Sequence, residues 1–364
     1  MIENTLDSLS LPEKIGQLFF IGIPGAEFDE QTEQLLTTVK PGGVCLFARN
    51  IREAKQTRRL LDEIRVVSKV EPCLSLDQEG GLVDRLRRVL TPMPAANKIK
   101  TKQQAAQLAA LIAEATRILG FNMDFAPVVD VIDDKRSAFS NGLHSRAFGS
   151  NASEVTDLAA AFIEGLQQGG IAGCLKHFPG LGAAEVDSHE ELPNMNITRD
   201  ELESVDLLPY RSIKASSVMV GHAAYPKLNL QEAHQNGKLL PASLSFNFVT
   251  KLLRQELGFN GVAITDDLEM GAIIKNYGIG TACKMAINAG EDMLAICANP
   301  DLILEGHAVI IDAVATGIIS EERIDESIMR IGRLKSSLCP PLPFDAARLE
   351  TLSAEIAELN ARLN

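Results

Sequence analysis

Eight short apolar runs recur along the chain and constrain its fold more than any other feature. They are GQLFFIGI, GGVCLFA, CLSLD, FNMDFAPVVDV, IAGCLKHF, SVMVGHA, GVAITDD and DMLAI. Between them lie stretches with helical periodicity, for example 52–67, 102–119, 153–168, 242–257 and 280–289. Strands that alternate with helices are typical of parallel sheets with right-handed crossovers. The pattern predicts a single-domain α/β protein with a (β/α)8 TIM-type barrel, and an open doubly wound sheet is the alternative.

Polar side chains punctuate or close most of these runs. They are Asp77, Asp124, Asp130, Lys176, His177, His222, Asp266 and Asp267. One carboxylate in such a place could simply cap the following helix. A series of them is more typical of a barrel enzyme, because such an enzyme builds its site from the carboxyl ends of several strands.

The barrel is predicted to occupy residues 1–338. The remaining residues, 339–364, begin with the proline-rich stretch Cys339–Phe344 and continue as an amphipathic helix over 345–363. We expect this segment to be appended to the barrel surface.

Composition excludes several classes of protein. With 35 basic and 48 acidic residues the net charge is -13, and no basic block is present, so nucleic acid is not an expected partner. Six cysteines without a C-x-x-C pair indicate a reducing compartment. The first apolar run is too short for a membrane span and lacks a basic flank, which predicts a cytoplasmic protein. We expect a monomer, although the terminal helix is also compatible with a weak dimer.

Two stretches carry most of the chemistry. The first is LKHFPGLGAAEVDSH, from Leu175 to His189, and the second is GVAITDDLEM, from Gly261 to Met270. Together they supply a nucleophilic carboxylate, a proton donor and polar groups that could hold a substrate. This combination indicates an enzyme that acts on a sugar.

Several further stretches accompany these two. They are LPEKIGQLFFIG, GGVCLFARN, LDQEGGLVDRL, MDFAPVVDV, RAFG, VMVGHAAYP and PASLS. With them the chain resembles glycoside hydrolase family 3, and in particular its bacterial β-N-acetylglucosaminidases, over roughly nine tenths of its length. The resemblance implies a retaining exo-enzyme without metal or cofactor. It would remove N-acetylglucosamine from a saccharide or muropeptide during cell-wall recycling.

The resemblance also implies the catalytic roles. Asp266, the first carboxylate of T-D-D-L, would be the nucleophile, and Asp267 is expected on the other face of the strand. Asp187 and His189 would form an acid/base dyad in which the carboxylate supports the imidazolium. The competing interpretations are structural: Asp266 could cap a helix, and D-S-H-E-E could be a helix start that leaves His189 exposed.

Sugar-binding roles carry over to four residues in the same way. These are Asp77, Arg146, Lys176 and His177, because carboxylates accept from sugar hydroxyls and cations donate to them. His222 is a fifth candidate substrate contact, unless it is simply a buried core histidine. Lys176 could instead be only an ion-pair partner of Asp77, and Arg146 a surface residue.

Several functions compete with this hypothesis. His177, His189, His222 and Asp266 superficially resemble the ligands of a metallohydrolase, but no H-x-H pair is present and we expect no metal. Phosphorolysis and sugar binding without turnover are also compatible with these residues. Cleavage of unacetylated β-glucosides, which also occurs in the family, is a third alternative, and the pair Asp187 and His189 argues against it. The chain departs from the family pattern in the residues that stand at Leu82, Leu181, Ala183 and Ala184. These departures bear on leaving-group specificity and rate more than on reaction type.

Overall fold

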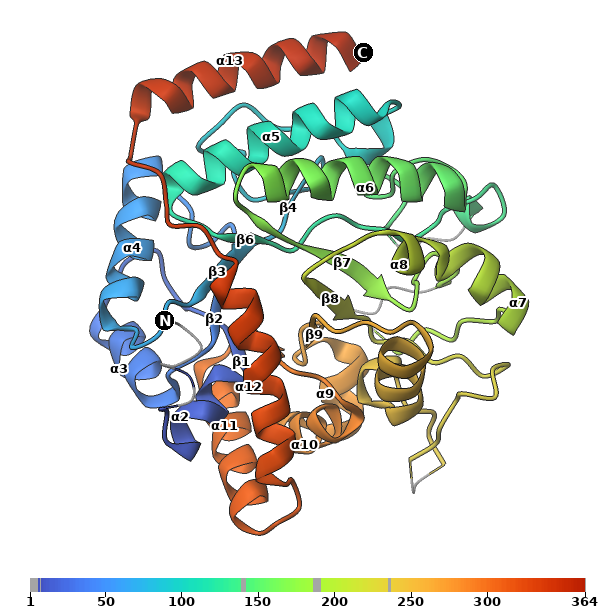
Figure 1. Ribbon diagram of the computed structural model, residues 1–364. Helices are drawn as coiled ribbons and strands as arrows, with labels where there is room; N and C mark the ends of the chain where they lie inside the picture. Colours follow the sequence, from blue (N-terminus) through green and yellow to red (C-terminus); the bar gives the residue numbers. More distant parts are fainter. Residues whose placement is uncertain (1–5, 7, 139–141, 186–190, 235–236, 364) are drawn as a thin grey trace.

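The computed structural model describes residues 6, 8–138, 142–185, 191–234 and 237–363 (Figure 1). Each of the eight apolar runs forms a parallel strand, as predicted. The strands are β1 Phe19–Gly22, β2 Gly43–Leu46, β3 Cys73–Leu76, β6 Met123–Asp124, β7 Ala172–Phe178, β8 Ser217–Val220, β9 Val262–Thr265 and β10 Leu294–Ile296. A short antiparallel hairpin, β4 Gln78–Gly80 with β5 Val83–Asp84, follows β3 and was not predicted.

The parallel strands form two sheets, in the orders β10-β1-β2-β3 and β6-β7-β8-β9. Backbone hydrogen bonds also connect the sheets at both pairs of edges. Asn122 N donates to Leu74 O (3.1 Å) and Phe125 N to Leu76 O (2.9 Å), which links β3 to the β6 region. At the other edge Thr265 N donates to Met293 O (3.0 Å). The chain therefore has a single continuous α/β core, and the prediction of one domain with parallel strands agrees with it.

Helices surround these sheets. The longer ones are α2 Leu11–Gln17, α3 Glu30–Val39, α4 Ala54–Val67, α5 Lys102–Leu119, α6 Ala152–Gln168, η5 Asn247–Glu256, α9 Gly271–Tyr277, α10 Ile279–Ala289, α11 Pro300–Ala315, α12 Glu321–Ser336 and α13 Ala346–Leu363. Shorter helical segments are η1 Ala96–Lys98, η2 Arg136–Ala138, α7 Arg199–Glu201, η3 Leu202–Asp206, α8 Leu208–Ser212 and η4 Ala242–Leu244. All five stretches with predicted helical periodicity are helical. No described helix is both long and apolar enough to cross a membrane.

Close packing inside the strands depends on small residues. A Cβ atom on Gly43 of β2 would lie 2.5 Å from the ring of Phe20 on β1. The Phe20 ring in turn packs on Phe125, with ring centroids 4.8 Å apart. Glycine at position 43 therefore makes the space that this aromatic pair occupies.

Two buried polar contacts attach α12 to the rest of the fold. Asp292, just before β10, accepts from Arg330 Nη1 (3.0 Å) and Ser327 Oγ (2.9 Å) of α12. The fully buried Lys335 donates from Nζ to Gln17 Oε1 of α2 at 2.7 Å. Burial lowers the pKa of Lys335 to about 8. The Lys335 contact joins α12 to α2, and the Asp292 contacts join α12 to the segment before β10.

The predicted terminal helix is present as α13, which lies across α5 (Figure 1). Leu352 and Ile356 are fully buried in this contact, and Arg348 forms a two-pronged ion pair with Glu114 of α5. The division at residue 338 stays a prediction.

The other side of α13 reaches the segment after the β4–β5 hairpin. Ser353 Oγ accepts from Thr91 N (3.2 Å), and Asn360 Nδ2 donates to Pro92 O (2.9 Å). The next residue, Met93, donates from its backbone N to Asp84 Oδ2 of β5 at 2.9 Å. α13 is thus one contact away from the hairpin.

Candidate active site

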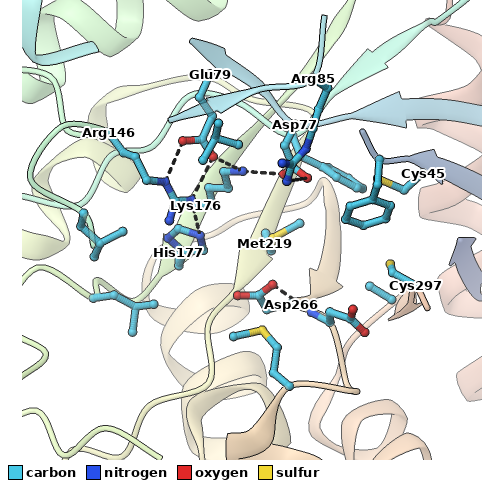
Figure 2. A pocket seen from close by; sticks show the side chains of 18 of the residues that line it. Cys45, Asp77, Glu79, Arg85, Arg146, Lys176, His177, Met219, Asp266 and Cys297 are labelled. Carbon is cyan, nitrogen blue, oxygen red and sulfur yellow. Dashed lines mark hydrogen bonds and ion pairs between the residues drawn. The ribbon is translucent and has the colours of Figure 1, made fainter. Parts of the chain in front are cut away.

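The carboxyl ends of the strands surround a pocket (Figure 2). Its residues are Cys45, Phe47, Asp77, Glu79, Val83, Arg85, Phe125, Leu143, Arg146, Lys176, His177, Leu181, Ala184, Pro193, Met219, Asp266, Asp267, Met270, Ala295 and Cys297. Its cavity volume of about 200 Å³ is below the range usual for drug-sized ligands, so it suits a small polar molecule.

Lys176 and His177 both enter this pocket although they are consecutive residues of β7. Successive side chains of a regular strand point to opposite faces. The pairing of β7 with β8 is irregular between Leu175 and Phe178, and this irregularity allows both side chains to face the same cavity. Lys176 Nζ lies 2.7 Å from Asp77 Oδ1 and 2.6 Å from Glu79 Oε1.

Arg146 is held against the opposite side of Glu79. Its Nε donates to Glu79 Oε2 (2.8 Å) and its Nη2 to Glu79 Oε1 (2.9 Å). Arg146 Nη2 also lies 3.5 Å from His177 Nε2. The alternative interpretation of Arg146 as a surface residue is therefore wrong, because the side chain is mostly buried in this network.

His177 is oriented from behind by Asp130. The Nδ1 atom of His177 lies 2.7 Å from Asp130 Oδ2, and the other carboxylate oxygen accepts from Leu181 N at 2.6 Å. Since Nδ1 is engaged, Nε2 is the ring nitrogen directed at Arg146 and the pocket. Asp130 lies in the segment between β6 and β7. Its carboxylate therefore supports both His177 and the glycine-rich segment that follows β7.

Charge balance in this cluster is nearly complete. Burial alone would raise the pKa of Glu79, but Lys176 and Arg146 together lower it to about 2. Burial would lower the pKa of Lys176, and the charges of Asp77 and Glu79 outweigh it and raise that pKa above its usual value. The cluster therefore holds charged side chains in fixed positions at neutral pH.

Asp266 lies across the pocket from the Lys176 cluster (Figure 2). It follows β9, and its backbone N donates to Val220 O at 3.0 Å, so the end of β8 fixes its position. Its Oδ1 accepts from Asp267 N at 2.9 Å. A half-buried carboxylate at a strand end, opposite fixed cations, has the placement that a nucleophile requires.

Asp267 does not point to the other face of the strand, and that prediction is wrong. It lines the same pocket as Asp266. Strand β9 ends at Thr265, so the alternation of side chains no longer applies, and Asp267 Oδ1 accepts from Glu269 N (3.1 Å) in a tight turn. Burial, together with the charges of Glu269 and Asp266, raises the pKa of Asp267 to about 7.

His222 lies beside the pocket and not in its lining. The side chain is fully buried, with Nδ1 2.7 Å from Ser243 Oγ and Nε2 3.1 Å from the backbone oxygen of Asp267. The geometry corrects the predicted substrate contact in favour of a buried core histidine. His222 supports the turn that carries the two aspartates.

The predicted dyad residues Asp187 and His189 lie outside the described residues. The chain on either side of them does reach the pocket, since Ala184 and Pro193 both line it. Two departures from the family pattern, Leu181 and Ala184, also face the cavity. Leu82 is largely exposed at the hairpin tip and does not line the pocket.

Sequence reasoning missed three charged residues of this site. Glu79 and Arg85 belong to D-Q-E-G-G-L-V-D-R, and only its first residue was chosen as a contact. Arg85 lies over the Phe47 ring (5.5 Å to its centroid), with Nη2 3.4 Å from Asp77 Oδ2. Asp130 was noted only as a polar residue of its run. The density of charge in the hairpin sequence was the signal available for Glu79 and Arg85.

Within the described ranges, no group of three or more His, Cys, Asp or Glu side chains is arranged to hold a metal ion. All six cysteines are free thiols, and Cys45 and Cys297 line the pocket. Burial raises the pKa of both pocket thiols well above the usual value, so they are neutral groups there.

Comparisons with known proteins agree with this geometry. The N-terminal domain of glycosyl hydrolase family 3 matches residues 10–334. A β-hexosaminidase of Tolumonas auensis is 33% identical over 288 residues, which are 77% of this chain and 82% of the relative. A β-hexosaminidase of Idiomarina loihiensis is 31% identical over 320 residues, covering 85% and 92% of the two chains.

A solved structure extends the similarity to the whole fold. The family 3 β-N-acetylglucosaminidase of a Paenibacillus species superposes with a TM-score of 0.87 at 32% identity, over 97% of this chain and 69% of that one. The chain therefore belongs to glycosyl hydrolase family 3, and the resemblance noted in the sequence is confirmed.

Proposed function

We propose that the protein is a retaining exo-β-N-acetylglucosaminidase. The observation that carries the proposal is the placement of Asp266 across a small pocket from Asp77, Arg146, Lys176 and His177. Such a pocket offers one carboxylate to an anomeric carbon and several fixed donors and acceptors to sugar hydroxyls. The relatives' names, β-hexosaminidase and β-N-acetylglucosaminidase, support an N-acetylated substrate.

In the proposed mechanism Asp266 attacks the anomeric carbon and forms a glycosyl-enzyme ester. The bond from that carbon to the leaving oxygen breaks, and His189 protonates the oxygen. In the second step His189 takes a proton from water, the water oxygen attacks the anomeric carbon, and Asp266 leaves with its electron pair. Asp187 would stabilise the imidazolium of His189 in each step.

Binding of the sugar would rest on the charged cluster. Asp77 would accept from hydroxyl groups, while Lys176 and Arg146 would donate to hydroxyl oxygens. Arg85 is a further donor at the same edge of the pocket, since it contacts Asp77 only at 3.4 Å. Each hydrogen bond to a charged group contributes on the order of 1.5 to 3 kcal/mol.

The remaining parts of the proposal concern setting and shape. The natural substrate is proposed to be a muropeptide with terminal N-acetylglucosamine, cleaved during cell-wall recycling by a monomer. Cytoplasmic location is proposed because all six thiols are free, a state that a reducing compartment preserves. The two sheets are proposed to form one closed (β/α)8 barrel, which the backbone hydrogen bonds at both pairs of edges support.

Hydrolysis is proposed over phosphorolysis because the pocket cations already have carboxylate partners. Lys176 contacts Asp77 and Glu79, and Arg146 contacts Glu79, all within 3 Å. An incoming phosphate would have to compete with these carboxylates for Lys176 and Arg146.

The test is release of nitrophenol from the aryl β-N-acetylglucosaminide and the matching β-glucoside, without phosphate and then with it. Turnover of the acetylated sugar alone, unaffected by phosphate, is expected. Acceleration by phosphate with sugar 1-phosphate as product would identify a phosphorylase. Preference for the glucoside would contradict the substrate assignment, and N-acetylglucosamine binding without turnover would indicate a sugar-binding protein.

A further inference from the structure

Glu79 joins the two cations of the sugar site. It lies on β4, its side chain is almost fully buried, and both carboxylate oxygens are used. Oε1 contacts Lys176 Nζ at 2.6 Å and Arg146 Nη2 at 2.9 Å, while Oε2 accepts from Arg146 Nε at 2.8 Å. One carboxylate therefore sets the distance between the two donors (Figure 2).

The hairpin that carries Glu79 is itself fixed by hydrogen bonds of the neighbouring residue Gln78. Gln78 N donates to Asp124 Oδ1 (2.9 Å), and Gln78 Nε2 donates to Asp84 Oδ1 (2.8 Å). The hairpin turns through Gly80 and Gly81, at φ 89° and 60°, which are conformations that favour glycine. The backbone at Glu79 is therefore fixed, and the positions of Lys176 and Arg146 are set by the position of the Glu79 carboxylate.

Electrostatics gives this contact a second effect. The ionisable groups that face Lys176 are Asp77, Glu79, Arg146, Asp124, Cys45 and Cys174. Burial raises the pKa of Asp124 and of both thiols, so these three are neutral. Arg146 and burial both disfavour the ammonium form of Lys176, whereas Asp77 and Glu79 favour it and outweigh them.

We propose that Glu79 is a positioning residue of the sugar site, which holds Lys176 and Arg146 at a fixed separation and keeps Lys176 charged. It acts through these two donors and does not itself contact the reacting atoms. The inference rests on the proposed function, because it takes the sugar as the ligand of both cations.

The test compares Glu79→Gln with the native enzyme in kcat, KM and their pH dependence on an aryl β-N-acetylglucosaminide. The glutamine amide can accept from one cation but presents its NH2 group to the other. We expect kcat/KM to fall about 10- to 100-fold, chiefly through KM, since charge-assisted hydrogen bonds to the substrate are lost. The alkaline limb of sugar binding, which is the pH at which N-acetylglucosamine affinity measured by calorimetry falls, should move to lower pH, because Lys176 loses its proton more readily without Glu79.

Two further variants make the test decisive. Glu27→Gln removes a carboxylate from an exposed ion pair with Arg59, away from the pocket, and should leave kcat/KM and the alkaline limb unchanged. Glu79→Asp keeps the charge but is one methylene shorter, so it cannot reach both cations. It should restore the alkaline limb toward the native position while KM stays raised, and it carries the test if Glu79→Gln does not fold.

The outcomes separate this inference from the proposed function. A folded Glu79→Gln enzyme with native kcat/KM and alkaline limb, or a Glu79→Asp enzyme with native KM and limb, would overturn the role of Glu79. If the native protein turns over no glycoside, the proposed function fails. Calorimetric titration with N-acetylglucosamine across the same pH range then still decides whether Glu79 holds the site.

Discussion

At the scale of single residues, two adjacent aspartates in one pocket occupy different environments. Asp266 is held by β8 and accepts from the next amide, whereas Asp267 is tied into a turn and has a pKa raised to about 7. Neighbouring carboxylates whose environments differ in this way are expected to differ in role. Asp266 can serve as the nucleophile, and Asp267 is neutral over much of the acid range.

We predict that Asp266→Asn lowers kcat at least about 1,000-fold while N-acetylglucosamine still binds, because the attacking oxygen is lost but the opposite wall is intact. Steady-state kinetics and calorimetry on the same preparation measure both effects. Retention of native kcat would exclude Asp266 as the nucleophile.

For Asp267→Asn we predict activity within about tenfold of native at pH 6, because asparagine mimics the protonated acid that prevails below the pKa. Above pH 7 native Asp267 ionises and places a second charge beside Asp266, so the native profile should contain a transition near pH 7 that the variant lacks. Superimposable pH profiles of kcat/KM would show that Asp267 does not titrate in this range.

Sequence patterns indicate pocket residues at strand ends more readily than residues whose partners are distant. Asp77, Lys176 and His177 each close an apolar run and match the family resemblance, and all three line the pocket. Glu79 was missed, since its contact with Arg146 spans 67 positions and no local pattern records it. His222 also closes a run, yet its ring is fully buried, with Ser243 Oγ near one nitrogen and the backbone oxygen of Asp267 near the other.

At the scale of elements, α12 is fixed by charged groups that are buried. Its Lys335 has no exposed surface, and its ammonium group has Gln17 Oε1 as a partner at 2.7 Å. An amide oxygen only partly replaces water around an ammonium ion, which explains why burial lowers this pKa to about 8. The helix therefore includes a group that opposes folding at neutral pH.

The stability of the protein should consequently rise with pH in one window. Unfolded Lys335 keeps its proton up to about 10.5, whereas the folded form releases it near 8, so the unfolded state binds more protons between these values. Chemical denaturation should show the free energy of unfolding increase by roughly 3 kcal/mol from Lys335 across that window.

Lys335→Met should remove this rise, whereas methionine at the exposed Lys55 should keep it. A native protein whose unfolding free energy does not increase between pH 8 and 10.5 would show that Lys335 stays protonated in the fold.

At the scale of the whole molecule, the alternation of strand and helix was sufficient to predict the strands, their direction and most helices. The eight runs are long enough and apolar enough that burial decides their structure. The β4–β5 hairpin could not be predicted in this way, because its five residues are mostly polar and depend on Asp124 and Met93 for their place. The proposed closure of the barrel likewise depends on contacts between distant strands.

A closed barrel makes a prediction for hydrogen exchange. The amides of Asn122 and Phe125 at one junction, and of Thr265 at the other, should exchange as slowly as those inside the sheets, because closure leaves no free edge. Amide exchange followed by mass spectrometry or NMR provides the measurement. Junction amides that exchange much faster than those of β2 and β8 would indicate two separately opening sheets.

Substitutions in the terminal helix α13 can affect the sugar site without changing any residue of the pocket. The helix lies beyond residues 10–334, which match the N-terminal domain of the family, and it contacts Thr91 and Pro92 just before Met93 anchors the hairpin. α13 therefore acts as a buttress, and substitutions in it can shift the hairpin while every residue in contact with sugar stays the same. Substitutions in this outer helix, natural or engineered, can therefore adjust the affinity for sugar. A fusion partner joined at the C-terminus would be attached directly to the same helix.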